Sequence, residues 1–417
     1  MKTLNRLTLS LALVATLAGA ATAATDNTET WPQWRGPDRD GTYNGAAWPD
    51  SLSKGRLKLS WKKELDAGYS SPIVSRDKVF TVETLDKKQE VVRAFDRTTG
   101  KEIWKSHWDG AMSVPFFARA NGSWVRCTPA LDENRLFVGG MRDILVCLDA
   151  ETGDINWKVD FVKRNKTPLP SFGFVSSPLV HGDHVYVQAG GGFMKLNKST
   201  GETVWKSMYD GGGMYGSAFS SPFIGKLHGQ EVALVQARME LAAVDLNTGR
   251  PLWKQPVKAF RGMNILTPTI YKDGLFTSAY GGRTSMFQTR DTGEDVEVSL
   301  AWDNKLQGYM STPVVVDGHA YLHLRNTRMA CVNLDNGTVA WTSTERFGKY
   351  MSMVANGDKI LALDQNGELL LLKTNAKQLE TLDRARVSDQ ETWAHLAVAD
   401  RQLFVRELRG ITVYDWR

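Results

Sequence analysis

Two short patterns of apolar and polar residues alternate along most of the chain. In the first, Ser or Thr and then Pro precede a short apolar run, a polar turn and a second apolar run. In the second, an apolar run leads to Thr-Gly or Asn-Gly and, four residues after the glycine, to tryptophan. Short apolar runs between such turn residues are typical of β-strands. Each pair of patterns therefore predicts a unit of four antiparallel strands.

The two patterns recur with one stretched and two worn copies. The first pattern is found at residues 70–72, 127–129, 176–178, 220–222, 266–268 and 311–313. The second is found at residues 99–104, 152–157, 200–205, 248–253 and 336–341. In the stretched copy Gly293 is followed by tryptophan only at position 302, and the runs at 353–361 and 396–404 keep the apolar spacing without the proline. Repeats of roughly 45 residues with these features predict a β-propeller.

The first and last parts of the repeat region are expected to complete one blade together. The last copy has only three predicted strands, whereas the run from Leu57 to Lys63 resembles a tryptophan-bearing strand. Pairing these two segments removes an open sheet edge, which would invite aggregation. We therefore predict an all-β fold: an eight-bladed β-propeller of four-stranded antiparallel blades over residues 56–417, its ring closed by an N-terminal strand that completes the last blade.

The repeated tryptophans are assigned to the fold. Their fixed position after a turn glycine predicts that each indole wedges between neighbouring blades, where it buries a large area. The proline near the start of each first strand lacks an N–H where that costs least. The glycine takes the positive φ that a tight turn requires.

The first residues are expected to act as a cleaved export signal. Lys2 and Arg6 precede an apolar stretch with no acidic residue, and small residues follow up to Ala23, which is the pattern of a secretory signal peptide. Residues 1–23 are predicted as signal peptide and 24–55 as an N-terminal extension, with a periplasmic or extracellular location. There is no cysteine near Ala23, so lipidation is not predicted. No later apolar run is long enough to span a membrane.

Composition narrows the classes of partner. Without Lys2 and Arg6 the chain has 49 basic and 46 acidic residues, a net charge of +3. A nucleic-acid partner normally goes with a stronger basic bias, so none is predicted. Three cysteines leave at least one thiol unpaired. Cys127, Cys147 and Cys331 are expected to lie inside strands as small buried hydrophobes.

The motifs resemble those of a known family. The segment from Leu148 to Trp157, LDAETGDINW, is similar to the PQQ-type repeat of quinoprotein alcohol dehydrogenases and of BamB-type outer-membrane assembly proteins. The segments WPQWRGPDRDG at 31–41 and GYSSP at 68–72 resemble a narrower group of exported, non-lipidated PQQ-like propeller proteins. The resemblance implies the propeller fold for essentially the whole mature chain but no single activity.

The enzymes of that family carry an adjacent cysteine pair beside the quinone, Glu, Asn and Asp ligands for calcium, and an Asp base. In this chain no two cysteines are adjacent, and no ligand set or base can be matched residue by residue. Asp38, Asp40 and Thr42 resemble the start of a calcium loop without its later ligands. We predict no catalytic residue, no metal site and no cofactor, and keep PQQ with calcium as the alternative.

Candidate ligand-binding residues fall in the connections of one face. If the first strand of each blade runs from top to bottom, the top face carries the longer and more irregular loops, which suit binding. An arginine in five of the eight turns between second and third strands suggests a ring of cations around a central funnel. The predicted top-face residues are Arg142, Arg238, Arg283, Arg325, Arg406, Trp108, Trp124, Tyr215, Arg261 and Trp393.

Two interpretations of these residues stay open. In one, the aromatics close apolar seams between blades and the arginines pair with acids such as Asp143 and Glu240. In the other, they recognise an anionic or carbohydrate ligand or an extended peptide, because arginine offers a planar donor fork and aromatics offer stacking faces. The segment from Trp31 to Gly41 also has two interpretations: a strap over an edge or the bottom of the propeller, or a docking segment for a partner.

Two functions from different classes are consistent with these features. The first is an exported, non-catalytic binding or scaffold propeller, a monomer that recognises a protein, peptide or polysaccharide ligand in the cell envelope, as outer-membrane assembly factors do. The alternative is a PQQ-dependent quinoprotein oxidoreductase. The missing cysteine pair favours the first, and the missing lipidation cysteine separates the chain from typical BamB proteins.

Overall fold

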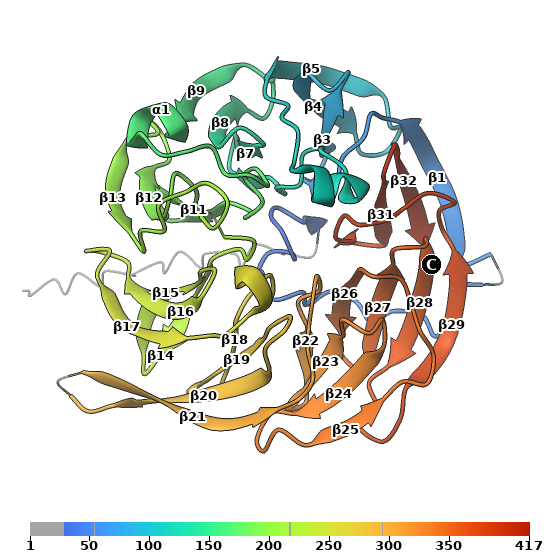
Figure 1. The fold of residues 1–417 in the computed structure, drawn as a ribbon. Helices are drawn as coiled ribbons and strands as arrows, with labels where there is room; N and C mark the ends of the chain where they lie inside the picture. The colour runs from blue at the N-terminus through green and yellow to red at the C-terminus, as the bar shows by residue number, and fades with distance from the viewer. Residues whose placement is uncertain (1–28, 54, 217, 294) are drawn as a thin grey trace, which may run out of the picture.

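Eight separate sheets form a ring in the structure, a computed structural model that describes residues 29–53, 55–216, 218–293 and 295–417. Each sheet has four antiparallel strands, and consecutive sheets lie side by side around a common centre (Figure 1). The prediction of an all-β, eight-bladed propeller is confirmed. The predicted signal peptide lies outside the described residues.

The strands of blades 1 to 7 follow the chain from the centre outwards. Blades 1 to 4 consist of β2 (Ile73–Val74), β3 (Lys78–Leu85), β4 (Gln89–Asp96) and β5 (Glu102–Asp109); β6 (Ala130–Asp132), β7 (Arg135–Gly140), β8 (Ile144–Asp149) and β9 (Ile155–Asp160); β10 (Leu179–His181), β11 (His184–Gln188), β12 (Phe193–Asn197) and β13 (Thr203–Ser207); and β14 (Phe223–Leu227), β15 (Gln230–Gln236), β16 (Glu240–Asp245) and β17 (Pro251–Pro256). Blades 5 to 7 consist of β18 (Thr269–Tyr271), β19 (Gly274–Ser278), β20 (Thr284–Asp291) and β21 (Val296–Asn304); β22 (Val314–Val316), β23 (His319–His323), β24 (Met329–Asn333) and β25 (Val339–Thr342); and β26 (Met351–Asn356), β27 (Lys359–Asp364), β28 (Glu368–Lys373) and β29 (Glu380–Arg386).

Blade 8 joins the two ends of the repeat region, as predicted. Its inner strands are β30 (Ala397–Ala399), β31 (Gln402–Glu407) and β32 (Gly410–Trp416), and its outer strand is β1 (Leu57–Glu64). The two segments pair antiparallel from Leu57 opposite Trp416 to Glu64 opposite Gly410. The ring therefore has no unpaired blade, which leaves no long open edge between its first and last sheets.

Five tryptophans at the repeated position fasten their blades to the next in the same way, as the sequence predicts. The indole Nε1 of Trp104 donates to the carbonyl of Ala150 at 3.1 Å, and its ring covers Gly153, where a Cβ would come within 2.6 Å. Gly153 has a φ of 79°, which an L side chain adopts only with strain. The same arrangement is formed by Trp61, Trp157, Trp205 and Trp302.

The Ser or Thr before each proline fastens the inner ends of the blades. The backbone N–H of Ser71 donates to Thr128 Oγ1, that of Thr128 to Ser177 Oγ, and that of Ser177 to Ser221 Oγ, at 3.2, 3.1 and 2.9 Å. The backbone N–H of His395 completes the contact between blades 8 and 1 by donating to Ser71 Oγ at 2.7 Å. In five of the six patterns the hydroxyl directly before the proline thus accepts a backbone N–H from the preceding blade, whereas the hydroxyl of Thr267 donates to the carbonyl of Ser221.

The segment 31–43, here called the central plug, fills the middle of the ring (Figure 1). Its ends are tied to inner strands: Trp31 pairs with Val74 of β2, and the N–H of Tyr43 donates to the carbonyl of Ala355 at 2.8 Å. Between them Arg35 and Arg39 are almost fully buried. Of the two interpretations of this segment, the structure shows a structural tie, which lies inside the ring instead of over its edge.

The two buried arginines of the plug bridge several blades. The Arg39 guanidinium donates to the carbonyls of Ser177 and Pro178 in blade 3 and Pro222 in blade 4, at 2.6, 2.9 and 2.8 Å. Arg35 donates to the carbonyl of Pro313 in blade 6 at 2.6 Å. Because the carbonyls at the inner edges have no neighbouring strand, the arginines satisfy oxygens that would otherwise be left unbonded.

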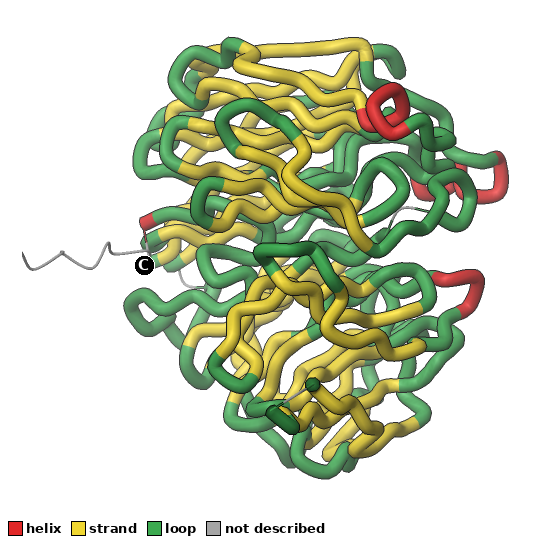
Figure 2. The backbone as a smooth tube through the Cα atoms, turned by 90° about the vertical axis from the view of Figure 1, so that its left-hand side faces the viewer, coloured by secondary structure: helices red, strands yellow, loops and turns green. Residues whose placement is uncertain are grey.

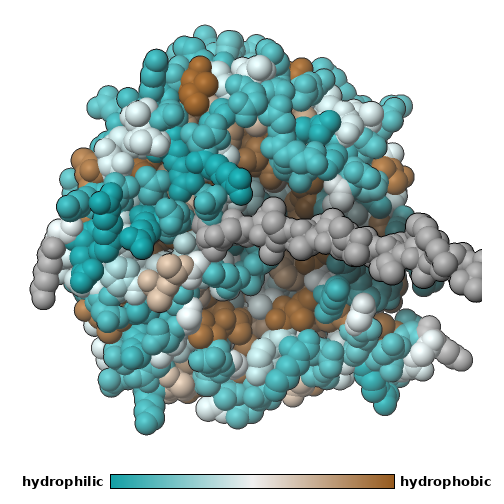
Figure 3. All heavy atoms as spheres, turned by 180° about the vertical axis from the view of Figure 1, so that it is seen from behind, coloured by the Kyte–Doolittle hydropathy of each residue, from teal (hydrophilic) through white to brown (hydrophobic). Residues whose placement is uncertain are grey.

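Short helices mark the top face. The helices η2 (Phe116–Asn121), α1 (Phe161–Asn165) and η3 (Phe260–Gly262) all lie in connections between blades and on one side of the disc (Figure 2). Figure 3 shows the opposite face, where hydrophilic side chains predominate and apolar ones form small groups. Among the described residues no helix has the length and apolar character needed to cross a membrane.

The three cysteines are buried and free. Cys147 lies in β8 and Cys331 in β24, as predicted. The prediction is wrong for Cys127, which lies in the connection just before β6, where its thiol donates to the carbonyl of Ser176 at 3.3 Å. Burial raises the pKa of the Cys127 thiol to about 12, so this sulfur is inert as a nucleophile.

Candidate functional site

A cavity of about 660 Å³ opens at the centre of the top face. All eight connections between blades contribute to its wall, and Trp34 at the tip of the central plug is part of its floor. We call it the top cavity. Its volume falls within the range of roughly 300–1,000 Å³ typical of small-ligand sites.

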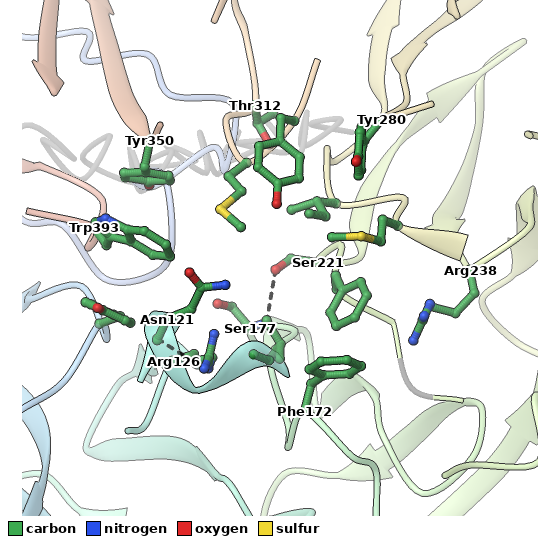
Figure 4. Close-up of a pocket in the computed structure, with 18 of the residues that line it drawn as sticks. Asn121, Arg126, Phe172, Ser177, Ser221, Arg238, Tyr280, Thr312, Tyr350 and Trp393 are labelled. Atoms are coloured by element: carbon green, nitrogen blue, oxygen red, sulfur yellow. Dashed lines mark hydrogen bonds between the residues drawn. The ribbon is translucent and has the colours of Figure 1, made fainter. Parts of the chain in front are cut away.

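Aromatic rings are the largest class of side chain in the wall. They are Trp34, Tyr69, Phe117, Phe172, Tyr215, Phe219, Phe260, Tyr280, Tyr309, Tyr350 and Trp393. On one side Trp393 stacks between Tyr69 and Tyr350, with ring centroids 5.0 and 6.5 Å away (Figure 4). At the rim the rings are open to solvent, since Tyr215 is 68% and Phe117 is 55% exposed. Such open rings present faces on which a ligand can stack.

Three arginines line the cavity, and none of them forms an ion pair with a described carboxylate. Arg126 donates to the carbonyls of Asn121 and Gly122, and Arg238 donates to the carbonyls of Arg261 and Gly262. The Arg238 guanidinium, labelled in Figure 4, also lies over the ring of Phe219, 4.3 Å from its centroid. None of the lining residues is Asp or Glu. The wall therefore carries positive charge that no acid in it neutralises.

Polar groups at the bottom of the cavity have spare hydrogen-bonding capacity. Hydroxyls of the Ser-x-Pro patterns line it, and because each accepts a backbone N–H, its own hydrogen is free to donate; they are Ser71, Thr128, Ser177, Ser221 and Thr312. His395, which is 5% exposed, donates from Nδ1 to the carbonyl of Leu396 at 2.9 Å, which leaves Nε2 as an acceptor with no described partner. Burial and the nearby Arg35 lower the pKa of His395 to about 3, so its ring is neutral near pH 7.

The plug adds two further cations directly below the floor. The guanidinium carbons of Arg35 and Arg39 each lie 5.6 Å from the centroid of the Trp34 ring. Burial lowers the pKa of Arg35 to about 10 and that of Arg39 to about 9, values at which both remain charged near pH 7. Charges in a site surrounded by protein are screened less than those at the surface. The floor is therefore electropositive.

The structure brings four of the ten predicted residues together. Arg238, Tyr215, Arg261 and Trp393 line the top cavity. Two others lie against lining residues: Arg325 over the Tyr280 ring at 4.4 Å, and Trp124 with its edge toward Tyr69 at 6.4 Å.

The other four do not form a ring of cations and aromatics. Arg406 is buried and donates inward to the carbonyls of Asp66, Glu407 and Gly410, so its prediction as a funnel residue is wrong. Trp108 is buried, with Nε1 donating to Glu90 at 2.7 Å. Arg283 is paired with Asp303 at 2.6 Å, and Arg142 is exposed away from the cavity wall. The predicted pairing of arginines with Asp143 and Glu240 is not observed either, because Glu240 pairs with Lys254 and Asp143 accepts the N–H of Gly190.

Several lining residues were missing from the predicted set. Trp34 had been assigned to a strap or a docking segment, and no role had been predicted for the hydroxyls that precede the prolines. Arg126 and Asn121 lie in the long connection around η2, whose length and aromatic content are the only signals in the sequence. No pattern in the sequence marks His395, because its blade has lost the proline motif.

This arrangement is suited to holding a ligand. No group of three or more His, Cys, Asp or Glu residues that could hold a metal ion is found in the described part of the chain. The lining offers rings, cations and hydroxyl donors, whereas a carboxylate that could act as a general acid or base is lacking.

Comparison with known proteins agrees with this fold. A relative from Shewanella oneidensis, named outer membrane protein assembly factor BamB, is 23% identical over 384 residues, which is 85% of this chain and 87% of the relative. The crystal structure of BamB from Moraxella catarrhalis is similar with a TM-score of 0.63 at 17% identity, over 87% of this chain and 98% of that one. Quinohemoprotein alcohol dehydrogenase from Comamonas testosteroni gives a TM-score of 0.55 at 12% identity, over 94% of this chain and 81% of that one.

At these identities the two solved structures show the shared propeller fold alone. The family itself is shown by sequence, since the family model described as outer membrane protein assembly factor BamB matches residues 87–343. That match covers more than half of the chain and spans the stretch from blade 1 to blade 6. The chain therefore belongs to the family of outer membrane protein assembly factor BamB.

Proposed function

We propose that this protein is an exported, non-catalytic binding propeller of the cell envelope that holds a protein, peptide or polymer ligand in its top cavity and serves outer-membrane assembly. The observation that carries the proposal is the composition of the cavity wall: open aromatic rings and arginines without a carboxylate. Membership of a family whose curated relatives are named assembly factors supports the envelope role. The predicted signal peptide supports export.

A calcium–quinone cofactor does not fit this cavity. Calcium prefers six to eight oxygen ligands, several from carboxylates, and the lining residues include none. The three cysteines are free and lie apart in the sequence, so none can form a disulfide with a neighbour in the chain. We derive no redox step for this chain. Incubation of the purified protein with PQQ and calcium is expected to leave no bound quinone absorbance and no dye reduction.

The proposal is tested by blocking the cavity in the source organism. Asn121 lies on η2 with its side chain directed into the cavity (Figure 4), and its amide makes no described hydrogen bond. Asn121→Trp should obstruct the cavity without removing a described contact between blades. Ala120→Trp adds the same side chain at the neighbouring exposed position and is the matched control.

A deletion strain should have altered levels of outer-membrane proteins, measured by mass spectrometry of the membrane fraction. The wild type and Ala120→Trp should restore those levels, and Asn121→Trp should not. Full restoration by a folded Asn121→Trp variant would show that the top cavity is not the working site. Native mass spectrometry of protein purified from its own envelope then reports the retained ligand.

A further inference from the structure

The positive charge of the top cavity favours a ligand that carries negative charge. Arg126, Arg238 and Arg261 line the wall, and none of them forms an ion pair with a described carboxylate. Arg35 and Arg39 lie below Trp34. The described hydrogen bonds of Arg35 all go to carbonyl oxygens, and those of Arg39 go mainly to carbonyl oxygens. Clefts lined by one sign of charge concentrate ligands of the opposite sign. An anion is therefore favoured and a cation is disfavoured.

The buried polar groups select a ligand rich in oxygen. Five hydroxyl hydrogens, the Trp393 Nε1–H and the Arg126 guanidinium are donors without a full set of partners in the described chain. His395 Nε2 is an acceptor that likewise has no described hydrogen-bond partner. Buried polar groups normally find a partner, so a ligand that satisfies them must offer many acceptors and at least one hydroxyl donor. A carboxylated sugar has both.

The inner strands offer a peptide little to bind. An extended peptide is usually recognised by adding a strand to a free sheet edge. Here a proline, which has no N–H to give, directly precedes the inner strand of six blades. At those same inner ends the plug arginines already occupy the carbonyls of Pro178, Pro222 and Pro313. Recognition in the top cavity must therefore use side chains.

The walls supply flat surfaces at the right place. Tyr215, Phe117 and Phe260 are exposed at the rim by 68%, 55% and 46%, and Tyr280 and Phe172 lie deeper in the wall. The apolar face of a pyranose ring, with its row of C–H groups, packs on the electron-rich face of an aromatic ring. Rings at the rim and cations at the floor thus suit a chain of sugars that carries carboxylates.

We infer that the top cavity binds an acidic oligosaccharide, with a uronic-acid carboxylate held by Arg126 and Arg238 and with sugar rings stacked on the aromatic wall. The inference rests on the proposed function, of which it names the ligand. The free N–H groups of Arg126 and the floor hydroxyls provide the charge-assisted hydrogen bonds, which are the stronger kind.

The test is isothermal titration calorimetry of the purified full chain at low salt. The probes are trigalacturonic acid, the same trisaccharide with its carboxyl groups reduced to alcohols, and a hexaglutamate peptide. The variants are Arg126→Gln, Asn121→Trp and, as control, Arg346→Gln, an exposed arginine outside the cavity wall that also binds a carbonyl. Asn121→Trp keeps the test valid should Arg126→Gln fail to fold, because it removes no contact between blades.

Trigalacturonic acid should bind to the wild type and to Arg346→Gln. Arg126→Gln should weaken it by on the order of tenfold to a hundredfold, as expected for hydrogen bonds to a charged group, and Asn121→Trp should abolish binding. The reduced trisaccharide should bind weakly and be insensitive to Arg126→Gln. Binding should weaken further as salt is raised.

The inference is overturned if trigalacturonic acid does not bind, if the reduced trisaccharide binds equally well, or if hexaglutamate binds more tightly than either sugar. These failures are distinct from failure of the proposed function. If Asn121→Trp fails to restore outer-membrane proteins while no sugar binds, the cavity works with another ligand and the sugar inference alone falls. If Asn121→Trp restores them fully, the proposed function falls as well.

Discussion

The contact between a turn glycine and the preceding tryptophan can be tested by adding one methyl group. In Gly201→Ala the new Cβ would lie 2.7 Å from Cε3 and 2.9 Å from Cδ2 of Trp157, well inside van der Waals contact. The φ of 71° at Gly201 adds strain for an L side chain. Gly182→Ala is the matched control, because its φ of 58° gives the same kind of strain while no atom lies within 4 Å of the added Cβ.

The expected cost follows from these two differences. Left-handed backbone strain costs about 1–2 kcal/mol in both variants. Overpacking against the indole adds about 1–3 kcal/mol in Gly201→Ala, and displacement of the ring weakens the Nε1 hydrogen bond to the carbonyl of Lys198, which is worth about 1 kcal/mol. The free energy of unfolding should therefore fall by about 2–4 kcal/mol more in Gly201→Ala than in Gly182→Ala.

Urea denaturation followed by tryptophan fluorescence and far-UV circular dichroism measures this difference. Coincident transitions from the two probes show whether a two-state treatment is justified. Replacing Trp157 with Leu in the Gly201→Ala background should recover part of the loss, because the clash is then removed. Equal costs for Gly201→Ala and Gly182→Ala would refute the reasoning, since backbone strain alone would then explain both.

Three further predictions concern buried groups. Burial raises the pKa of the fully buried Glu90 carboxyl from 4.5 to about 7. Its contribution to stability is therefore fully present below pH 4.5 and is lost as the pH rises to about 7. The free energy of unfolding, measured by urea titration across this range, should fall by on the order of 3 kcal/mol, and Glu90→Gln should show no such fall. Arg39→Met should lower the free energy of unfolding by about 2–4 kcal/mol because inner-edge carbonyls lose their donor, while Arg346→Met should leave it unchanged; a stable Arg39→Met variant would show that the plug is dispensable. Cys127 and Cys147, whose thiol pKa values burial raises to about 12 and about 11, should react with a disulfide reagent only after unfolding, and rapid labelling of the native protein would contradict their burial.

The repeating part of the structure could be predicted because the same local contact is made in each copy. A tryptophan at a fixed distance from a turn glycine recurs in the sequence, and the structure uses it in the same way in five blades, for example where Trp104 covers Gly153. Closure by β1 could be predicted for a similar reason, since a strand pattern without its own blade complements a blade that lacks a strand. Periodicity therefore determines the blades and their order.

The site was predicted only in part because it is formed by residues that do not repeat. A turn arginine can point outward or inward, and the sequence does not show which: Arg238 faces the cavity, whereas Arg406 folds back onto nearby carbonyls. The position of Trp34 depends on bonds between the plug arginines and carbonyls far away in the chain. Backbone carbonyls are present at every residue, so no sequence pattern distinguishes the ones that the arginines bind.

The central plug has a consequence for how a polymer can be engaged. A ring with an open bore lets a long chain pass through and be bound anywhere along its length. Here the central plug with Trp34, Arg35 and Arg39 occupies the bore below the cavity, so in the described part of the chain we expect a ligand to enter from the top face. A linear polymer can enter such a site only by a terminus or a tight bend. The amount of protein bound by a linear polymer should then scale with its number of chain ends, so that shortening the chains at constant mass raises the binding capacity in proportion.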